Sequence, residues 1–227
     1  MWSRLFCIHL LIVLTFGVAF QNSAFAGDPV ALFAPQLPPG ETPPIVDGDC
    51  DFSDYGTAWR FSKIHYRPVT SADPAAINIA TTPADIYFCI QGLQRTSTAS
   101  FSTLALVVDT DHGREPVAAF DDLRFEVRED DTGAIFFGTG SGGYSEGTTA
   151  IDWEWSLSFP DDFTWNAEIR IPRSALGDPA RFEVDGLRIV HEDVRSAGDS
   201  FAWPSSSLFA RPRTWGEMLW VDPPPEA

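Results

Sequence analysis

The feature of this chain that most limits its fold is a series of short segments in which apolar and polar residues alternate. The clearest is IDWEWSLSFP, residues 151–160, where Ile151, Trp153 and Trp155 alternate with Asp152 and Glu154. A strand places successive side chains on opposite faces, so this pattern predicts a half-buried strand. Whether its tryptophans fill a core or form a flat platform for a ligand depends on the rest of the chain.

Ten segments of this kind are rich in Val, Ile, Phe, Tyr or Trp and are separated by Gly, Pro, Asp and Ser. They are Trp59–Tyr66, Ala75–Ala80, Ala84–Leu93, Leu104–Asp109, Leu123–Arg128, Ala134–Phe137, Ile151–Phe159, Ala167–Ile171, Phe182–Val190 and Met218–Val221. About ten short strands at this spacing predict an all-β fold, an antiparallel β-sandwich. Arg173–Leu176, directly after Pro172, is the one predicted helical turn.

The two ends of the chain differ from this pattern. Residues 1–26 combine one basic residue, an apolar run and the small-residue site Ser23–Ala26, which is typical of a secretory signal peptide. We therefore expect a secreted or periplasmic protein. Residues 27–44 are predicted to be a Pro-rich lead-in without its own fold, residues 45–221 the sandwich, and residues 222–227 a disordered tail. No later apolar run is long enough to span a bilayer.

The charge of the chain excludes two classes of partner. Fifteen Lys and Arg residues face 32 Asp and Glu residues, for a formal net charge of −17. Such a surface repels nucleic acid and anionic membranes. It is compatible with calcium binding and with neutral ligands such as sugars.

Two cysteines, Cys50 and Cys89, lie outside the predicted signal peptide. In an oxidising compartment they could form one disulfide, and the alternative is two separate buried thiols. The chain has no CxxC motif and no closely spaced Cys/His cluster. A structural zinc site and a c-type haem are therefore not expected.

Several fragments, in order along residues 45–221, resemble family 9 carbohydrate-binding modules and their DOMON-like relatives. These fragments are Ile45–Asp49 ("I-D-G"), Ala84–Ile90, Leu106–Asp111, Ala167–Gly177 ("AEI-IP-S-LG") and Trp215–Trp220 ("WG-L"). The resemblance implies a jelly-roll-like β-sandwich that binds rather than catalyses. It implies a glycan or oligosaccharide as ligand, held against aromatic side chains, and calcium in a loop. A related branch of this fold holds a b-type haem and transfers electrons.

The strand Asn166–Ile171 is expected to pair with Ile151–Phe159 through the turn at residues 160–164. In that hairpin Trp153, Trp155 and Leu157 face the same side as the apolar residues of the partner strand. This arrangement favours core lining over a ligand platform, since aromatic side chains dominate cores. Trp155 could still reach the rim of a concave face.

Tryptophans next to turns are the stronger candidates for stacking on a sugar. Trp203 precedes Pro204, and Trp215 follows a short Arg/Pro segment. An exposed indole needs a cover, and sugar rings can supply it. The alternative is that both indoles pack back onto the sandwich. Nearby polar groups that could bond the hydroxyls are Arg195, Asp199, Arg211 and Arg213.

The turn Asp109–Glu115 is the leading candidate for a calcium site. Asp109 and Asp111 lie two residues apart, as in the start of a calcium loop, although the later ligands of such a loop are absent. Asp121 and Asp122 could complete the shell, and the turn Asp47–Asp49 is a second candidate. The alternative is a polar turn without metal.

Other functions have less support in the sequence. No pair of carboxylates stands out for glycoside hydrolysis, and no G-x-S-x-G motif is present, so we do not expect an enzyme. A b-haem would need axial ligands, for which the candidates are Met218 with His65, His112, His191 or Lys63. A structural or assembly protein of the cell envelope is the third alternative.

Overall fold

The structure is a computed structural model that describes residues 31–51, 55, 60–64, 75–95, 101–180, 183–192, 201–204, 207–208 and 210–221. The predicted signal peptide, the predicted tail, Arg195, Asp199 and His65 lie outside these residues. The described part contains no helix that is long and apolar enough to cross a membrane.

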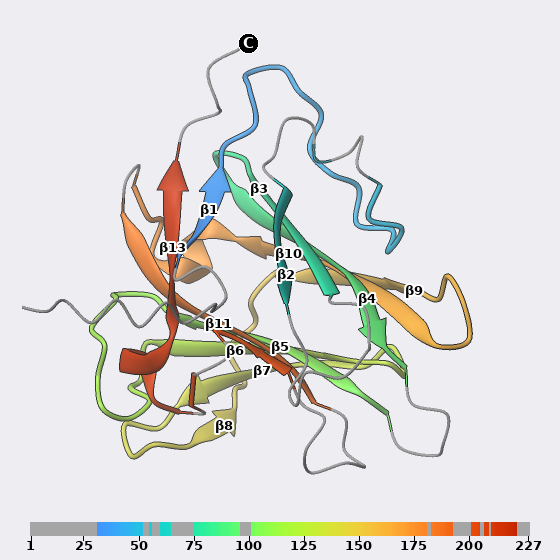
Figure 1. Cartoon of the computed structure of the whole chain (residues 1–227). Coiled ribbons are helices and arrows are strands. Elements are labelled where there is room, and N and C mark those ends of the chain that lie inside the picture. Colours follow the sequence, from blue (N-terminus) through green and yellow to red (C-terminus); the bar gives the residue numbers. More distant parts are fainter. Residues whose placement is uncertain are drawn as a thin grey trace, which may run out of the picture.

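Two β-sheets face each other and form the predicted sandwich (Figure 1). The larger sheet has the order β1-β13-β11-β5-β6-β7-β8, with β12 also paired to β11. Its strands are β1 Ala31–Pro35, β5 Thr103–Asp109, β6 Asp122–Arg128, β7 Gly133–Gly138, β8 Tyr144–Glu146, β11 Val184–Glu192, β12 Phe201–Trp203 and β13 Gly216–Val221. The smaller sheet has the order β2-β3-β4-β10-β9. Its strands are β2 Arg60–Ile64, β3 Ala75–Thr81, β4 Asp85–Gln94, β9 Glu154–Ser158 and β10 Thr164–Pro172.

All ten predicted strand segments contain a strand, and the predicted helical turn is the 3₁₀ helix η1, Arg173–Leu176. A second 3₁₀ helix, η2, covers Pro212–Thr214. The described strands pair antiparallel except β1, which pairs parallel with β13. The prediction of an all-β antiparallel sandwich is confirmed.

The lead-in, residues 27–44, was predicted to have no fold of its own, and this is wrong for residues 31–35. These residues form β1, an edge strand in register with β13 from Ala31↔Glu217 to Pro35↔Val221. Leu32 and Ala34 are fully buried in the core. Only two inward side chains alternate here, and the prolines that follow conceal so short a pattern.

The core lies between the sheets and is lined by alternate residues of both. In the β9–β10 hairpin, Leu157 pairs with Ala167 and Trp155 with Ile169, as predicted. Trp153 and Trp155 are half-buried and pack against the core, with their ring centroids 4.6 Å apart. The tryptophans of this strand therefore line the core, as the sequence favoured. Trp165 on β10 is fully buried in the same core cluster.

A buried carboxylate, Glu168 on β10, anchors the N-terminal segment to the smaller sheet. Glu168 Oε2 accepts hydrogen bonds from the backbone N–H of Gly48 at 2.8 Å and of Asp47 at 3.1 Å, and Oε1 accepts one from Tyr55 Oη at 3.1 Å. Gly48 has φ +91°, and a Cβ there would lie 2.6 Å from the Leu157 carbonyl carbon, so glycine is required. The turn Asp47–Asp49, considered above for calcium, thus serves to dock this segment.

The predicted disulfide between Cys50 and Cys89 is present. The two Cα atoms lie 5.5 Å apart, and 39 positions of the sequence separate the residues. The bridge ties the docked N-terminal segment to β4. A disulfide of this span commonly stabilises a fold by about 2–4 kcal/mol.

His191 on β11 gives the fold an acid-sensitive group. It is buried beside Trp165, at 5.8 Å between ring centroids, and burial lowers its pKa from 6.5 to about 3. The unfolded chain therefore binds this proton at a higher pH than the fold does, and the contribution of this group to stability is lost as the pH falls below 6.5. Between pH 7 and pH 5, we expect the unfolding free energy of His191→Leu to rise by about 2 kcal/mol relative to that of the parent, because the variant lacks this loss.

Urea unfolding at both pH values measures this effect. The compared quantity is the change in unfolding free energy between the two pH values for each protein. A change in stability that the substitution causes equally at both pH values therefore cancels. An unchanged pH dependence in His191→Leu would contradict a buried neutral imidazole.

Candidate functional site

The outer face of the larger sheet, the side turned away from the smaller sheet, carries a second cluster of apolar side chains. On β5 the residues Leu104, Leu106 and Val108 point into the core, so Ala105 and Val107 point outward. Trp215 and Val190 pack on these two residues, and half-buried Tyr144 borders the cluster. The segment that leads from β12 to β13 thus folds back over this face.

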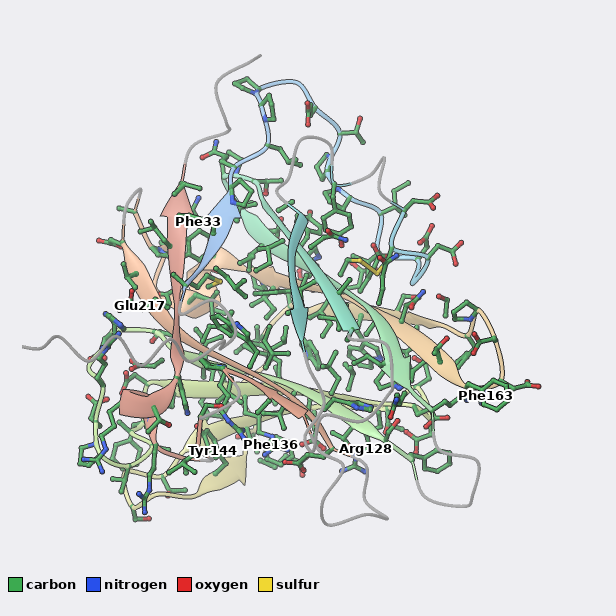
Figure 2. All side chains as sticks on the ribbon, in the orientation of Figure 1. Phe33, Arg128, Phe136, Tyr144, Phe163 and Glu217 are labelled. Atoms are coloured by element: carbon green, nitrogen blue, oxygen red, sulfur yellow. A yellow bond between two sulfur atoms is a disulfide. The ribbon has the colours of Figure 1, made fainter. Side chains whose placement is uncertain are left out.

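Charged side chains of β6 stand on the same outer face. Arg124 Nη2 lies 2.6 Å from Glu126 Oε2, and Arg128 Nε lies 3.3 Å from Glu126 Oε1. The Arg124 guanidinium carbon lies 5.7 Å from the centre of the Phe136 ring on β7. Figure 2 shows Phe136, Tyr144 and Arg128 along this side of the sheet.

Two further titratable groups of the outer face are buried Arg188 and half-buried Tyr144. Arg188 on β11 donates from Nε to Ser207 Oγ at 3.1 Å, and burial lowers its pKa to about 10. Burial also raises the pKa of Tyr144 above its usual value. Perturbed titratable groups tend to gather at functional sites.

The outer face combines half-buried aromatic rings with an ion pair between a guanidinium and a carboxylate, and this combination limits the type of ligand that it can bind. The rings of Phe136 and Tyr144 can cover an apolar surface, while Arg124 and Glu126 hold donors and an acceptor in fixed positions. The face therefore fits a neutral molecule that has an apolar side and several hydroxyl groups.

Five carboxylates gather at one end of the larger sheet; we refer to this group as the acidic end. Ligand atoms of Asp109, Asp111 and Glu115 lie within 4.8 Å of one another, and so do those of Asp109, Asp121 and Asp122. Asp109 and Asp122 come together because they pair across β5 and β6. The positive φ of His112, 52°, and of Arg114, 53°, folds the intervening turn back onto Asp109.

Hydrogen bonds hold the acidic end but leave some of its oxygens free. Asp109 accepts from the backbone N–H of Gly113 and of Arg114, each at 3.1 Å, and Asp122 Oδ2 accepts from Ala119 N–H at 2.6 Å. Glu115 Oε2, Asp121 Oδ2 and Asp122 Oδ1 are buried without a donor among the described residues.

The electrostatics of the acidic end are those of crowded anions. Burial, with a smaller contribution from the neighbouring carboxylates, raises the pKa of Asp109 to about 6 and that of Asp122 to about 7. A cation would relieve this repulsion. An all-oxygen set of carboxylates is the ligand chemistry that calcium prefers, and the free buried oxygens fit that role.

The predicted tryptophans do not form an exposed platform. Trp203 is fully buried in the main core, because β12 pairs with β11 and turns this indole inward. It has no exposed face for a sugar, so the prediction that Trp203 stacks on a ligand is wrong for this structure. Trp215 is 6% exposed and donates from Nε1 to the Leu208 carbonyl at 3.2 Å, so it serves chiefly as a wall of the outer face. Trp155 is half-buried against the core.

The predicted arginine Arg213 is exposed on η2, close to the acidic end. Its backbone N–H bonds the Glu115 carbonyl at 3.4 Å, and Arg211 beside it is also exposed. The structure therefore brings Asp109 and Asp111 to the same side of the molecule as Arg213 and Trp215, although about 100 positions of the sequence separate the two pairs.

The candidate haem ligands are spread through the molecule. Met218 is fully buried in the main core, and His112 lies in the acidic turn, where its Nε2 accepts from Arg114 Nε at 2.9 Å. His191 is buried on the inner side of β11. Only the backbone of Lys63 is described.

Sequence reasoning missed Arg124, Glu126, Phe136, Tyr144 and Arg188. A signal was present in the first two, because LRFEVR alternates apolar and charged residues along β6. Charged residues on one side of a strand normally indicate that this side faces solvent. Only the segment folded over this face distinguishes the outer face from an ordinary solvated surface.

Comparison with known proteins extends the description of the fold. No family model and no curated relative matches the chain. A family 9 carbohydrate-binding module from Caldicellulosiruptor kristjanssonii in complex with cellotriose matches with a TM-score of 0.63 and 12% identity, over 86% of this chain and 95% of that one. Its complex with glucose gives the same TM-score and identity, over 87% and 98%.

A candidate carbohydrate-binding protein from Bacteroides uniformis matches with a TM-score of 0.57 and 11% identity, over 86% of this chain and 100% of that one. The chain thus has the fold of family 9 carbohydrate-binding modules, which the sequence fragments resembled.

Proposed function

We propose that this protein binds a glycan without catalysis, through the outer face of its larger sheet, with calcium at the acidic end. The observation that carries the proposal is the arrangement on that face, where the rings of Phe136 and Tyr144 lie beside the Arg124–Glu126 ion pair. Modules of the same fold hold cellotriose and glucose.

The chemistry of the face matches that of a sugar. A pyranose ring presents C–H groups on one side, which an aromatic ring desolvates, and hydroxyls around its edge. Arg124 can donate to such hydroxyls and Glu126 can accept from them. Both Glu126 oxygens already bond guanidinium groups, which favours a role as acceptor over proton transfer to a substrate.

Calcium at the acidic end would act on the same surface. Asp122 and Arg124 lie two residues apart on β6 and therefore point to the same side of the sheet. The turn that follows Asp109 is joined to the segment that covers the outer face, through the Arg213–Glu115 and Ala118–Ala210 backbone bonds. A bound cation would hold the segment that covers the outer face in place.

The proposed setting is secreted or periplasmic. The disulfide between Cys50 and Cys89 supports it, because disulfides persist in oxidising compartments. The predicted signal peptide agrees with this setting.

Titration calorimetry with cellotriose and with glucose tests the proposed face. We expect Tyr144→Ala and Phe136→Ala each to weaken binding about tenfold or more, which corresponds to about 1.4 kcal/mol, because each removes a ring that covers the sugar. Phe163→Ala is the matched control, since Phe163 is 77% exposed and lies at the far end of the β9–β10 hairpin (Figure 2). It should bind as the parent does.

A glycan array of the parent protein, with calcium and with EDTA, covers the case in which the ligand is another sugar. Any glycan found there replaces cellotriose in the calorimetry. Binding to no glycan in either condition would overturn the proposal, and so would equal losses in Phe163→Ala and Tyr144→Ala.

A further inference from the structure

A pocket of about 530 Å³ opens between the two sheets, on the inner side of β6 and β7. Its lining comes from both sheets and from the connection between β8 and β9. The apolar lining includes Leu123, Phe137, Ile151 and Ala175, and the polar lining includes Thr149 and Asp152. The volume lies within the range of small-molecule sites, roughly 300–1,000 Å³.

The pocket is separate from the outer face. Leu123 and Phe137 pair across β6 and β7, and both pack with the inward-facing core. Their strand neighbours Arg124 and Phe136 point outward, because side chains alternate along a strand. A ligand in the pocket and a glycan on the outer face would therefore lie on opposite sides of the same two strands.

Just before the lining residues Thr149–Asp152, the backbone passes close to the Phe137 ring of the pocket. A Cβ at Gly147 would clash with the Phe137 ring, so the chain can lie this close to that ring only because residue 147 is glycine. Gly147 N–H bonds the Ile135 carbonyl at 2.9 Å, which holds the chain there. The connection is thereby kept at the mouth, and the pocket is part of the fold.

The charge at the mouth selects among ligands. The Asp152 side chain is 96% exposed, and its Oδ2 lies 3.6 Å from Arg170 Nη2. Arg170 also pairs with Asp85 and Glu154, so its charge is shared among three carboxylates. Among the described residues, those that line the pocket include no cationic side chain. An anion would meet the Asp152 carboxylate and the negative field of the whole chain, formally −17.

We propose that this pocket is a second binding site, which takes a small uncharged or cationic molecule with an apolar ring body and rejects anionic molecules of the same shape. The apolar lining covers the body of the ligand, and Asp152 accepts a hydrogen bond from its hydroxyl or amine. The site goes beyond the proposed glycan function and does not depend on it.

Two fluorescent probes with the same ring system test the site. N-phenyl-1-naphthylamine is uncharged and can donate from its amine, and 8-anilinonaphthalene-1-sulfonate carries a sulfonate. A low concentration of each is titrated with protein at pH 7. We expect saturable binding of the uncharged probe with a Kd of about 0.1–1 mM, typical of a ligand of this size, and at least about tenfold weaker binding of the sulfonate.

Three tryptophan substitutions locate the bound probe, and a fourth substitution tests the role of the Asp152 charge. Ala175→Trp fills the pocket and should abolish the signal of the uncharged probe, and Ser174→Trp at the exposed mouth gives the same test with less disturbance of the fold. Ser141→Trp, on an exposed loop that does not line the pocket, is the control and should leave the signal unchanged. Asp152→Asn should reduce the difference between the two probes to about threefold or less, because the carboxylate that repels the sulfonate is gone.

The results distinguish specific binding in the pocket from nonspecific adsorption of the probe to the protein surface. An equal signal in the parent, Ala175→Trp and Ser174→Trp would overturn the proposal, and so would equal affinity for both probes in the parent. Glycan binding of Ala175→Trp, measured separately, should equal that of the parent. A loss of probe binding with intact glycan binding would establish two independent sites.

Discussion

Calcium is expected to raise the Tm of chelator-treated protein, by about 10 °C at pH 8 when calcium exceeds its Kd about a thousandfold, and by much less at pH 5. In the metal-free fold the pKa of Asp109 is about 6 and that of Asp122 about 7, against 3.8 in the unfolded chain. The fold therefore holds more protons than the unfolded chain does, and this contribution to stability is lost as the pH rises from about 4 to 7. At pH 8 the ionised carboxylates repel one another, and the cation offsets that repulsion.

Differential scanning calorimetry at both pH values, with calcium and with EDTA, measures the effect. Asp122→Asn should remove most of the calcium-dependent rise, since it removes a charged ligand from the acidic end. Asp162→Asn, on the exposed β9–β10 turn, is the matched control and should keep the full rise. A rise that is equal in Asp122→Asn and in the parent would place the calcium elsewhere, and the absence of any rise at pH 8 would exclude a calcium site of useful affinity.

Replacing Glu168 by alanine should lower the free energy of unfolding by about 4 kcal/mol. Glu168 is fully buried and is the acceptor for three donors, the N–H groups of Asp47 and Gly48 and the hydroxyl of Tyr55. The alanine variant removes this acceptor from all three donors and leaves a void where the side chain lay. Each loss of a buried partner typically costs about 1–3 kcal/mol, partly recovered by relaxation of the segment.

Urea unfolding measures this difference under conditions that keep the disulfide intact. Glu168→Gln retains one acceptor oxygen and should lose about half as much. Glu154→Ala, on the neighbouring strand β9, is the control: its carboxylate is exposed and bonds Arg170 at 3.2 Å, so we expect a loss below about 1 kcal/mol. Similar losses for Glu154→Ala and Glu168→Ala would contradict the anchoring role of Glu168.

The same anchor explains why two distant sequence fragments occur together. Ile45–Asp49 and Ala167–Gly177 each contributed to the resemblance with carbohydrate-binding modules, and about 120 positions separate them. In the structure the amide groups of the first fragment bond the glutamate of the second. Sequence reasoning identified both fragments but could not pair them. A local sequence pattern does not reveal which distant backbone donor bonds a buried carboxylate.

The tryptophans show where local patterns fail. Trp203 stands beside a proline and near serines, which locally indicates an exposed turn. Its pairing with Ile189 on β11 instead directs the indole into the core. Trp153 and Trp155 were placed correctly, since their alternation with charged residues is repeated by the partner strand of the same hairpin.

Local sequence patterns were enough to predict the all-β class, ten of the strands, the β9–β10 hairpin and the two cysteines available for one disulfide. These features follow from the two-residue period of strands and from neighbours that are close in the chain, both of which can be read locally. Contacts between distant segments were needed to establish that β1 joins the core, that Trp203 is buried and that the outer face carries Arg124, Glu126, Phe136 and Tyr144. Alternation shows that a strand has two faces, but which of them is covered depends on the partner strand or segment. That partner lies 14 positions away for Trp203 and Ile189, and 186 positions away for Ala31 and Glu217.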